Sequence, residues 1–388
     1  MKVHSKNMNK VIILGNDHTN TVGLVQSFGR INISVIAVVW GVKTGIVKKS
    51  RYLSGFYSAP DVDKCIEIIA LNFANSNDSY LIIPGCDLAA IKLEANRDKL
   101  PSNILYQYVK GIYKVNELEN KELQVKIASN SGFETPWSYK INSLSQIPNN
   151  IEYPCLIKPL ASYQGSKADL LVCENIGDLR RNLKLVLSRT PEVLLQKYIR
   201  KDNEFTIIGC GLKDGRVFIP FICQKLEIYP PKVGLESVIE TIDFPPGIKE
   251  ACIQYICSIG YCGLFSIELM HSEEDSKYYF TECNLRNDGD NGFVLLAGCN
   301  VAFVHYADMF GELSDDMLQK ECEKNIYIWD MHHFLSLLHR DISLKQWISD
   351  IKKSKGFLMY FPEDPAPFIK QYTNWILEKI HIRKPNNY

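Results

Sequence analysis

Short apolar runs alternate with amphipathic stretches over the N-terminal part of the chain. Residues 11–14 and 34–39 are typical of buried strands, and residues 21–29 between them are typical of a helix. A third strand is expected over residues 80–84, again flanked by helical patterns. Because parallel strands need long crossovers that are usually helices, this alternation predicts a parallel α/β domain over residues 1–115.

The loop after the first strand, GNDHTNTVG, has too few glycines for a dinucleotide fingerprint. A ligand at the carboxyl end of that strand stays an alternative, and Asp17 and His18 would then line it. A helix-capping or surface position is the other explanation for His18. Asp87 follows the third strand, where a helix N-cap explains it without any function.

From Tyr153 onward, the pattern changes to short strands separated by polar loops. The strand PCLIKPL holds Lys158, and the loop ASYQGSKAD follows it. A lysine inside an apolar strand needs an anion such as phosphate. Gly165 would let the loop backbone approach that phosphate, while Ser166 and Lys167 would add a hydroxyl and a charge. The alternative is a surface hairpin in which Lys158 extends its ammonium group to water.

Two strands are predicted on either side of an exposed connector, over residues 193–196 and 204–210. An apolar strand followed by such a connector can present backbone groups to an adenine. Glu204 could reach a ribose or a metal ion, or pair with Lys225 on a neighbouring strand, and the sequence supports both equally. The loop YPPKVGLES holds Lys232 between prolines and a glycine, which makes it rigid enough to present a cation.

A β-hairpin is predicted where GLFSIELM and YYFTEC flank a polar turn. Acidic residues on such strands usually form a solvated face. Here Glu268 and Glu282 are embedded among apolar residues, so each needs a partner. Together with Asn284 they would offer the hard oxygen ligands that suit Mg²⁺ bridging nucleotide phosphates. Arg286 follows, with a planar fork that fits a phosphate or a carboxylate.

Overall composition excludes several classes of partner. The 44 basic and 44 acidic residues cancel, so no net charge favours nucleic acid or an anionic membrane. The 12 cysteines contain no CxxC pair, which is typical of reduced thiols. No apolar stretch approaches the roughly 20 residues of a transmembrane helix. We therefore expect a cytoplasmic protein without a transmembrane segment or a nucleic-acid partner.

The motifs taken together resemble an ATP-grasp ligase, within the carboxylate-amine ligase group that includes D-aspartate ligases. The resemblance covers residues 9–304 and rests on LIKPL, GSK, LLQKYI and the hairpin FSIELM with YYFTECNLR. It implies an α/β and α+β protein, with an ATP-grasp fold preceded by a parallel α/β pre-ATP-grasp domain. The implied parts are residues 1–115 for that domain, 116–200 for a linker helix and small lid subdomain, 201–311 for a central subdomain with the metal site, and 312–388 for a C-terminal helical extension.

The resemblance also implies which residues bind ATP. Lys158 and Lys167 would contact its phosphates, with Gly165 and Ser166 in the same loop. Glu204 would face the ribose. The residues lining the adenine would be Gln196, Lys197, Tyr198 and Ile199.

The chemistry that the resemblance implies takes place around the predicted hairpin. Arg286 would bind the transferring phosphoryl group or an acyl phosphate, and Lys225 and Lys232 would place cations near the phosphates or the substrate carboxylate. The Mg²⁺ ligands, with Mn²⁺ as an alternative metal, would be Glu268, Glu282 and Asn284.

Two departures from the group's pattern leave the substrate open. Leu285 replaces a proline, and NDGDNG replaces a glycine-rich stretch that commonly helps to hold the acceptor carboxylate. The side chains of this stretch could instead recognise an amine or a hydroxyl-rich substrate: Asn287, Asp288, Asp290 and Asn291.

The implied function is an ATP-dependent carbon-nitrogen ligase that joins a small carboxylate to a small amine through an acyl phosphate and releases ADP and phosphate. The alternatives are a non-catalytic nucleotide-binding or partner-binding protein and an ATP-dependent carboxylase. The terminal amphipathic helix, residues 368–382, could dock on the body, pair with a second subunit in a homodimer or touch a membrane.

Overall fold

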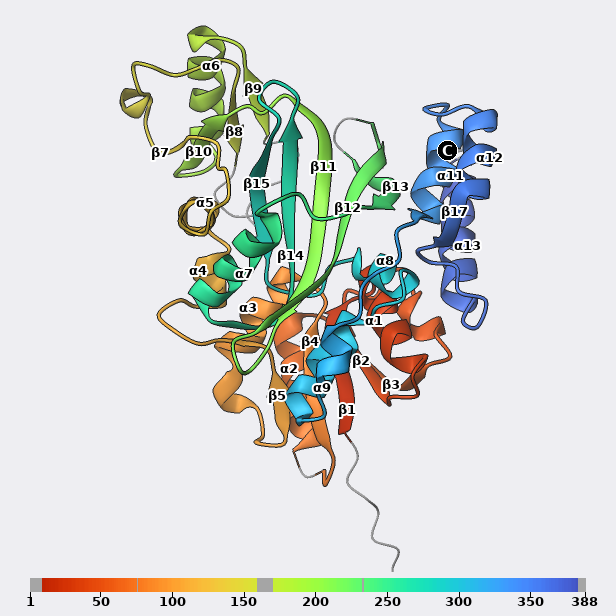
Figure 1. The fold of residues 1–388 in the computed structure, drawn as a ribbon. Helices are drawn as coiled ribbons and strands as arrows, with labels where there is room; N and C mark the ends of the chain where they lie inside the picture. Colours follow the sequence, from red (N-terminus) through yellow and green to blue (C-terminus); the bar gives the residue numbers. More distant parts are fainter. Residues whose placement is uncertain (1–8, 75, 159–169, 232–233, 383–388) are drawn as a thin grey trace, which may run out of the picture.

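The computed structural model describes residues 9–74, 76–158, 170–231 and 234–382. Its strands form a five-stranded sheet, a four-stranded sheet and an eight-stranded sheet. In Figure 1 the five-stranded sheet lies at the bottom, the four-stranded sheet at the upper left and the large sheet between them. The architecture is mixed α/β, with a parallel sheet, a small antiparallel sheet and a large sheet that is antiparallel except where β16 pairs with β17, in agreement with the fold class predicted from the sequence.

The N-terminal layer is a parallel sheet with helices packed on it. Its elements are β1 (Asn9–Asn16), α1 (Thr19–Gly29), β2 (Val35–Trp40), η1 (Val47–Lys49), β3 (Leu53–Ala59), α2 (Val62–Phe73), β4 (Ser79–Pro84), α3 (Asp87–Ala95), η2 (Arg97–Lys99) and β5 (Ile104–Tyr106). The strand order is β3-β2-β1-β4-β5, and every pairing is parallel. Because the order reverses between β1 and β4, their carboxyl ends frame the crevice where open α/β sheets usually bind ligands.

The small sheet is antiparallel, with strand order β7-β10-β8-β9, and α6 packs on it. Its elements and those before it are β6 (Tyr108–Val109), α4 (Val115–Leu118), α5 (Lys121–Asn130), β7 (Ser138–Ile141), η3 (Leu144–Gln146), β8 (Cys155–Lys158), β9 (Leu171–Cys173), α6 (Ile176–Leu187) and β10 (Val193–Lys197). The sequence predicted one helix over residues 117–130, but two form. Asn120 separates them because its side chain accepts hydrogen bonds from the N–H groups of Glu122 and Leu123 and so caps α5.

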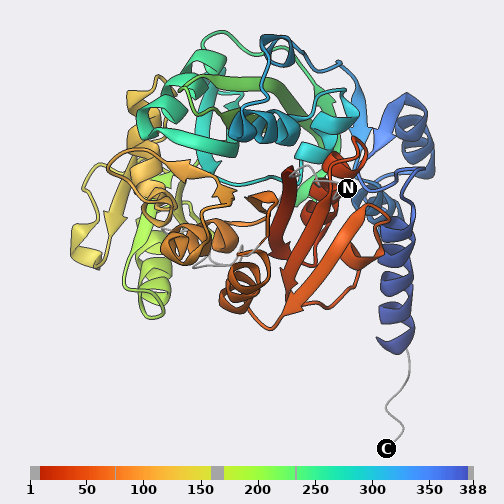
Figure 2. The same cartoon turned by 90° about the horizontal axis from the view of Figure 1, so that it is seen from below.

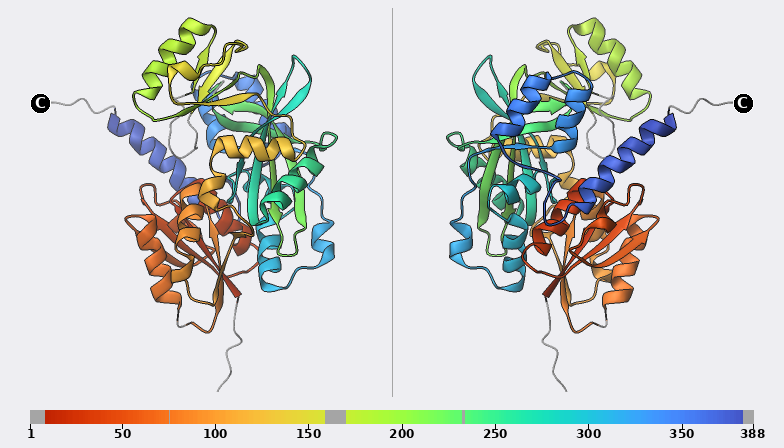
Figure 3. Two further views of the ribbon diagram at one scale, coloured as in Figure 1. Left: turned by 90° about the vertical axis from the view of Figure 1, so that its left-hand side faces the viewer. Right: turned by 90° about the vertical axis from the view of Figure 1, so that its right-hand side faces the viewer.

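The large sheet has the strand order β15-β14-β11-β12-β13-β16-β17, and β6 pairs with β14 beside this path. Its central elements are β11 (Lys201–Gly211), β12 (Val217–Tyr229), β13 (Leu235–Thr241), α7 (Ile248–Ile259), β14 (Tyr261–Ser272), β15 (Lys277–Asn284), α8 (Asn291–Leu296) and α9 (Val301–Phe310). The predicted hairpin is present as β14 and β15, which pair antiparallel. Figure 3 shows α5 crossing between the small sheet and the N-terminal layer, and α5 contacts β15.

The C-terminal segment contains strands as well as the helices that the sequence predicted. Its elements are α10 (Asp315–Leu318), β16 (Ile326–Ile328), α11 (Asp330–Leu338), α12 (Leu344–Lys353), β17 (Ser354–Phe357) and α13 (Ala366–Ile382). β16 pairs with β13, and β17 pairs with β16, so both extend the large sheet. Among the described residues, no helix combines the length and apolar character needed to cross a bilayer.

Two contacts fasten this segment to the N-terminal layer. Asp364, which is 1% exposed, accepts hydrogen bonds from the Ser50 hydroxyl at 2.6 Å and from the Arg51 backbone N–H at 2.9 Å. Asn374 on α13 donates to the Thr44 carbonyl oxygen at 2.7 Å. α13 therefore lies along the N-terminal layer, as Figure 2 shows.

The N-terminal layer and the large sheet share one apolar core. Val25 and Phe28 of α1 belong to the same buried cluster as Cys210 of β11 and Val301 of α9. Burial of apolar surface on this scale is the main force that holds two layers together. The carboxyl edge of the parallel sheet is thereby held against the loops at one end of the large sheet.

Candidate active site

Charged side chains from five neighbouring strands gather on one face of the large sheet. Successive side chains on a strand point to opposite faces, so residues in register share a face. Glu268 on β14 lies directly opposite Glu282 on β15. On the other side of Glu268, β11 brings Glu204, β12 brings Lys225 and β13 brings Glu236. The predicted metal-ligand positions on β14 and β15 therefore form one end of a longer charged row.

The surroundings of Glu268 in this row raise the pKa of its carboxylate. Burial raises its pKa to about 7, and the charges of Glu282 and Asp288 act in the same direction, although Lys225 opposes them. Glu268 forms no hydrogen bond or ion pair with any other residue in the described ranges. A buried carboxylate without a close partner is costly. A divalent cation at this position would remove that cost, so the residues present fit a metal ion.

Glu282 and Asn284 complete this oxygen-rich end of the hairpin. Burial acts to raise the pKa of Glu282, but Lys121 and Lys158 outweigh that effect and hold it below its usual value. The Lys121 ammonium lies 3.0 Å from Glu282 Oε2. The Asn284 amide donates to the Ser266 hydroxyl at 3.2 Å, and its carbonyl oxygen is the group that could ligate a metal.

Lys225 lies between two acidic side chains from neighbouring strands. Its ammonium is 3.5 Å from Glu204 Oε2 and 3.3 Å from Glu236 Oε2. Burial acts to lower the pKa of Lys225, yet Glu268, Glu236 and Asp290 raise it above the ordinary value. The pairing with Glu204 is one of the two interactions that the sequence left open for that residue. Lys225 therefore keeps its positive charge between the acidic side chains of the row.

Lys158 on β8 of the small sheet is buried, which is one of the two alternatives that the sequence left open, and does not extend into water. Its exposed fraction is 5%. Burial, followed by repulsion from Lys121, lowers its pKa to about 7, while Glu282 acts in the opposite direction. The small sheet thus places the Lys158 ammonium near the acidic end of the hairpin. The negative charge of Glu282 only partly offsets the cost of burying this ammonium. An anion such as a phosphate would supply the missing compensation.

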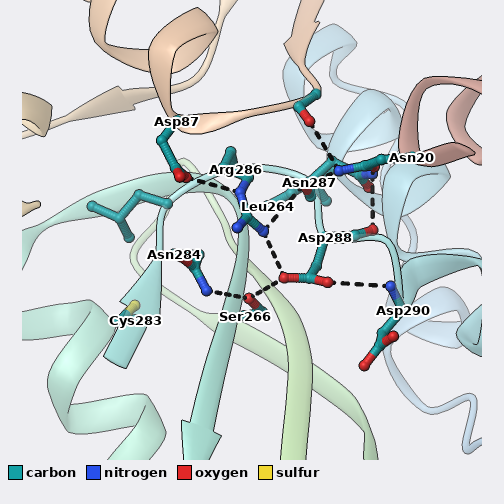
Figure 4. Close-up of polar contacts among 12 residues, drawn as sticks. Asn20, Asp87, Leu264, Ser266, Cys283, Asn284, Arg286, Asn287, Asp288 and Asp290 are labelled. Atoms are coloured by element: carbon teal, nitrogen blue, oxygen red, sulfur yellow. Dashed lines mark hydrogen bonds and ion pairs between the residues drawn. The ribbon is translucent and has the colours of Figure 1, made fainter. Parts of the chain in front are cut away.

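Arg286 connects the hairpin to the N-terminal layer. Its Nε donates to Asp87 Oδ1 at 2.9 Å, and its Nη1 donates to Asp288 Oδ2 at 2.5 Å (Figure 4). Asp288 also accepts from the Ser266 hydroxyl at 2.7 Å. These contacts fix the plane of the guanidinium group. The helix-cap explanation for Asp87 is wrong, because Cys86 is the N-cap of α3 and Asp87 is its first residue. The Asp87 carboxylate is instead an orienting partner of Arg286.

The loop after β15 docks at the carboxyl edge of the parallel sheet. The Asn20 amide at the start of α1 donates to the Gly85 and Asn287 carbonyl oxygens at 2.9 and 3.0 Å. The backbone N–H of Asn287 donates to the carbonyl oxygen of Pro84 at the end of β4 (Figure 4). Asn291 donates to Asn287 Oδ1 at 2.8 Å. Asn20 and Asn287 thus join the two layers at the carboxyl ends of β1 and β4, and Asn291 supports the Asn287 side chain.

Two other expectations for the N-terminal layer change with the structure. The Asp17 carboxylate accepts hydrogen bonds from the Thr44 N–H and hydroxyl at 2.8 and 2.7 Å and from the Val47 N–H at 3.1 Å. It therefore orders the chain's own loop instead of facing a ligand. His18 caps α1 by accepting from the Asn20 N–H, which is the non-functional alternative given above.

The remaining nucleotide residues are only partly described. Gln196 and Ile199 are buried, and the Lys197 ammonium lies over the Tyr279 ring at 5.6 Å. Tyr198 donates its backbone N–H to the Pro154 carbonyl oxygen at 3.3 Å. Their assignment to the adenine stays a prediction. Four predicted site residues lie outside the described residues: Gly165, Ser166, Lys167 and Lys232.

The sequence did not assign Glu119 to the site, and it named Asp290 only as a candidate for substrate recognition. Glu119, 3% exposed, follows α4; burial, followed by the Asp87 charge, raises its pKa to about 8. Asp290 has a buried Oδ1 without a hydrogen-bond partner, and burial together with Glu236 raises its pKa well above the usual value. Glu119 and Lys121 belong to a segment in which charged and polar residues are frequent, so no local pattern marked them.

Comparisons with known sequences give partial matches. No protein-family model matches the chain. It is 25% identical over 186 residues to the C-terminal section of the carbamoyl phosphate synthase large chain from Methanopyrus kandleri, covering 44% of this chain and 33% of that protein. It is also 25% identical over 211 residues to formate-dependent phosphoribosylglycinamide formyltransferase from Bacteroides fragilis, covering 51% of this chain and 50% of that protein. The chain therefore spans between a third and a half of these two relatives.

Solved structures match most of the chain. An L-amino acid ligase from Bacillus licheniformis superposes with a TM-score of 0.61 at 15% identity, covering 83% of this chain and 79% of the ligase. An ADP complex of N5-carboxyaminoimidazole ribonucleotide synthetase gives 0.65 at 12% identity, covering 86% of each chain. Biotin carboxylase from Campylobacter jejuni gives 0.64 at 16% identity, covering 82% and 74%. These likenesses show that the chain shares the ATP-grasp fold of these enzymes.

Proposed function

We propose that the protein is an ATP-dependent carboxylate-amine ligase that forms an amide through an acyl phosphate. The observation that carries the proposal is the convergence of Glu268, Glu282 and Asn284 on one end of the hairpin, with Lys158 and Arg286 beside them. Phosphoryl transfer needs positioning and charge neutralisation more than a protein nucleophile. This set of acids and cations supplies both.

The proposed metal ligands are Glu268, Glu282 and Asn284, which would hold Mg²⁺, with Mn²⁺ as an alternative. The ion would neutralise charge on the β- and γ-phosphates of ATP. Lys158 would bind a phosphate oxygen, and this anion would replace the water that burial removes from the ammonium group. Lys225, which pairs with Glu204 and Glu236, would reduce the repulsion between the acidic side chains of the row and the phosphates.

In the first reaction step, a substrate carboxylate oxygen attacks the γ-phosphorus of ATP. The bond from that phosphorus to the β,γ-bridging oxygen breaks, and ADP leaves. Arg286, held by Asp87 and Asp288, would bind the transferring phosphoryl group with its remaining N–H donors. The carboxylate thereby becomes a mixed anhydride, which is a far better acyl donor.

In the second step, the amine nitrogen attacks the acyl carbon, the bond to the phosphate oxygen breaks, and the nitrogen loses a proton. An amide and inorganic phosphate result. The site must exclude water at this stage, since water would hydrolyse the anhydride. The buried contacts of Asn20, Asn287 and Asn291 close the site on the side of the N-terminal layer.

The likeness to an L-amino acid ligase supports amide formation, and the likeness to biotin carboxylase and N5-carboxyaminoimidazole ribonucleotide synthetase supports the carboxylase alternative. Both reactions activate a carboxylate or bicarbonate with ATP. The perturbed pKa values of Glu268 and Lys158 within one charged cluster favour an enzyme over a non-catalytic binding protein. We propose small-molecule carboxylate and amine substrates.

The test is ADP and phosphate release with Mg-ATP across a panel of amino acids, dipeptides and sugar acids paired with amines, and with bicarbonate alone. Products are read by mass. Release that depends on a carboxylate and an amine, with an amide product, is expected. Release with bicarbonate and no amide would favour the carboxylase, and ATP binding without turnover on any pair would favour a binding protein.

Two variants connect the activity to the site. Glu282→Gln and Arg286→Ala should abolish ADP release while circular dichroism stays unchanged. Glu274→Gln is the matched control, because Glu274 lies in the exposed turn of the same hairpin and its carboxylate is 3.6 Å from Arg200. Normal turnover in a folded Glu282→Gln variant would contradict the assignment.

A further inference from the structure

A second cluster of ligating side chains lies outside the candidate active site, between β12 and the C-terminal helices. It consists of Glu227 on β12, His333 on α11 and Asp350 on α12. His333 Nε2 is 3.2 Å from Asp350 Oδ2 and 3.8 Å from Glu227 Oε2. The three ligand atoms lie within 4.8 Å of one another. One nitrogen and two oxygens therefore face a common point.

The charges of this cluster do not balance. Within the part of the chain that the structure describes, neither carboxylate forms an ion pair with a lysine or an arginine. Glu227 Oε2 is buried and makes no hydrogen bond. His333 is 1% exposed and Asp350 is 9% exposed, whereas Glu227 is 22% exposed. One buried and one partly buried carboxylate facing one imidazole are costly unless a cation joins them.

Neighbouring side chains hold the ligands in this orientation. The Gln346 amide donates to Asp350 Oδ1 at 2.7 Å, which leaves Oδ2 to face His333. The Trp347 ring stacks on the His333 ring, with centroids 6.1 Å apart and planes inclined by 15°. On β12, the register with β13 shifts on both sides of Glu227, which changes the direction of its side chain. Such outer contacts are what fix the ligands of metal sites.

We propose that Glu227, His333 and Asp350 bind one divalent transition-metal ion of the zinc class, which fastens α11 and α12 to β12. An imidazole nitrogen with two carboxylate oxygens suits Zn²⁺, whereas Mg²⁺ prefers oxygen ligands alone. Ligands about 2.0–2.2 Å from a tetrahedral zinc lie about 3.3–3.6 Å apart. The distances of 3.2 and 3.8 Å from His333 Nε2 bracket that spacing.

The proposed ion has a structural consequence that is independent of catalysis. The two helices and the strand meet through this cluster, so binding in the folded state alone would stabilise their contact. Glu227 is also two residues from Lys225 on the same strand. The site is nevertheless separate from the proposed magnesium ligands, since those lie on β14 and β15.

The test uses the full chain, stripped with a chelator and incubated with one equivalent of Zn²⁺ or Co²⁺ in the absence of nucleotide. Bound metal per chain is measured by mass spectrometry after gel filtration, and Co²⁺ coordination is measured by its visible absorption. Thermal unfolding is followed with and without zinc. The variants are Glu227→Gln in this cluster, and Glu282→Gln, which removes a proposed magnesium ligand but leaves the cluster intact.

We expect one zinc per chain in the wild type and in Glu282→Gln, a higher Tm with zinc, and at least a tenfold loss of zinc affinity in Glu227→Gln. Glu227 is partly accessible, and glutamine keeps its shape, so this variant should fold; His333→Gln provides the same test from the nitrogen side. Wild-type protein that retains no zinc would overturn the proposal. Zinc retained by both cluster variants, or lost from Glu282→Gln alone, would overturn it as well.

Discussion

The buried Lys158 side chain should lower the free energy of unfolding of the protein without a bound nucleotide, because burial disfavours its charged form. The side chain is 5% exposed on β8, and burial, followed by the charge of Lys121, lowers its pKa from 10.5 to about 7. The charged form is therefore disfavoured in the folded state. We predict that Lys158→Met, which keeps the length and the apolar stem, raises the free energy of unfolding and abolishes ATP turnover.

The size of the effect follows from the pKa difference. At about 1.4 kcal/mol for each pH unit, the difference between 10.5 and about 7 corresponds to an upper value of about 5 kcal/mol. Below pH 7 the lysine is charged in both states, and the folded state bears the whole cost. Between pH 7 and 10.5 the unfolded chain binds more protons, so stability rises with pH and the cost disappears. The gain from Lys158→Met should therefore be largest below pH 7 and shrink as pH rises.

Urea unfolding, followed by tryptophan fluorescence at about pH 6.5 and about pH 9.5, measures this difference directly. Lys140→Met is the matched control, since Lys140 lies in β7 of the same sheet, is 40% exposed and pairs with Glu192 at 2.7 Å. Its removal should change stability by less than about 1 kcal/mol at either pH. A Lys158→Met variant that is less stable than the wild type, or whose gain is the same at both pH values, would refute the reasoning.

Three further predictions concern the site. Burial and nearby acids raise the pKa of Glu268 to about 7, so its carboxylate becomes charged as the pH rises through 7. The Mg²⁺ concentration for half-maximal ADP release should therefore be higher at about pH 6 than at about pH 8. Equal Mg²⁺ concentrations at the two pH values would contradict this. Arg286→Lys keeps the charge but loses the fork that contacts two carboxylates, so kcat should fall by at least about tenfold in steady-state assays, and unchanged kcat would count against it. Asn287→Ala removes the side-chain hydrogen bonds to Asn20, Asp288 and Asn291 and should cost about 1–3 kcal/mol in urea unfolding, whereas a loss below about 0.5 kcal/mol would show that the loop is held by other contacts.

The sequence alone determined the elements that carry the site. Period-two alternation placed Glu268 and Glu282 on strands among apolar residues, and the two are directly opposite each other in β14 and β15. For Lys158 the sequence left burial beside an anion and a surface position both open, and the structure shows burial. The placement of the two glutamates follows from the sequence because strand pairing in a hairpin is set by neighbours within a few residues.

The short strands β16 and β17 were not found, because runs of three or four residues carry too little periodicity to separate a strand from a helix end. Their pairing with β13 depends on the large sheet, which is built from residues far earlier in the chain. The domain limits proposed from the sequence stay a prediction.

Only the tertiary structure decided which charges meet. Arg286 and Asp87 are 199 residues apart in the chain and 2.9 Å apart in the fold, and Asn20 reaches Asn287 across 267 residues. Lys121 joins Glu282 in the same way. Local pattern shows that a charge is embedded among apolar neighbours and needs a partner. The partner's identity depends on how separate layers pack, and that is fixed by the shared core and not by any spacing along the chain.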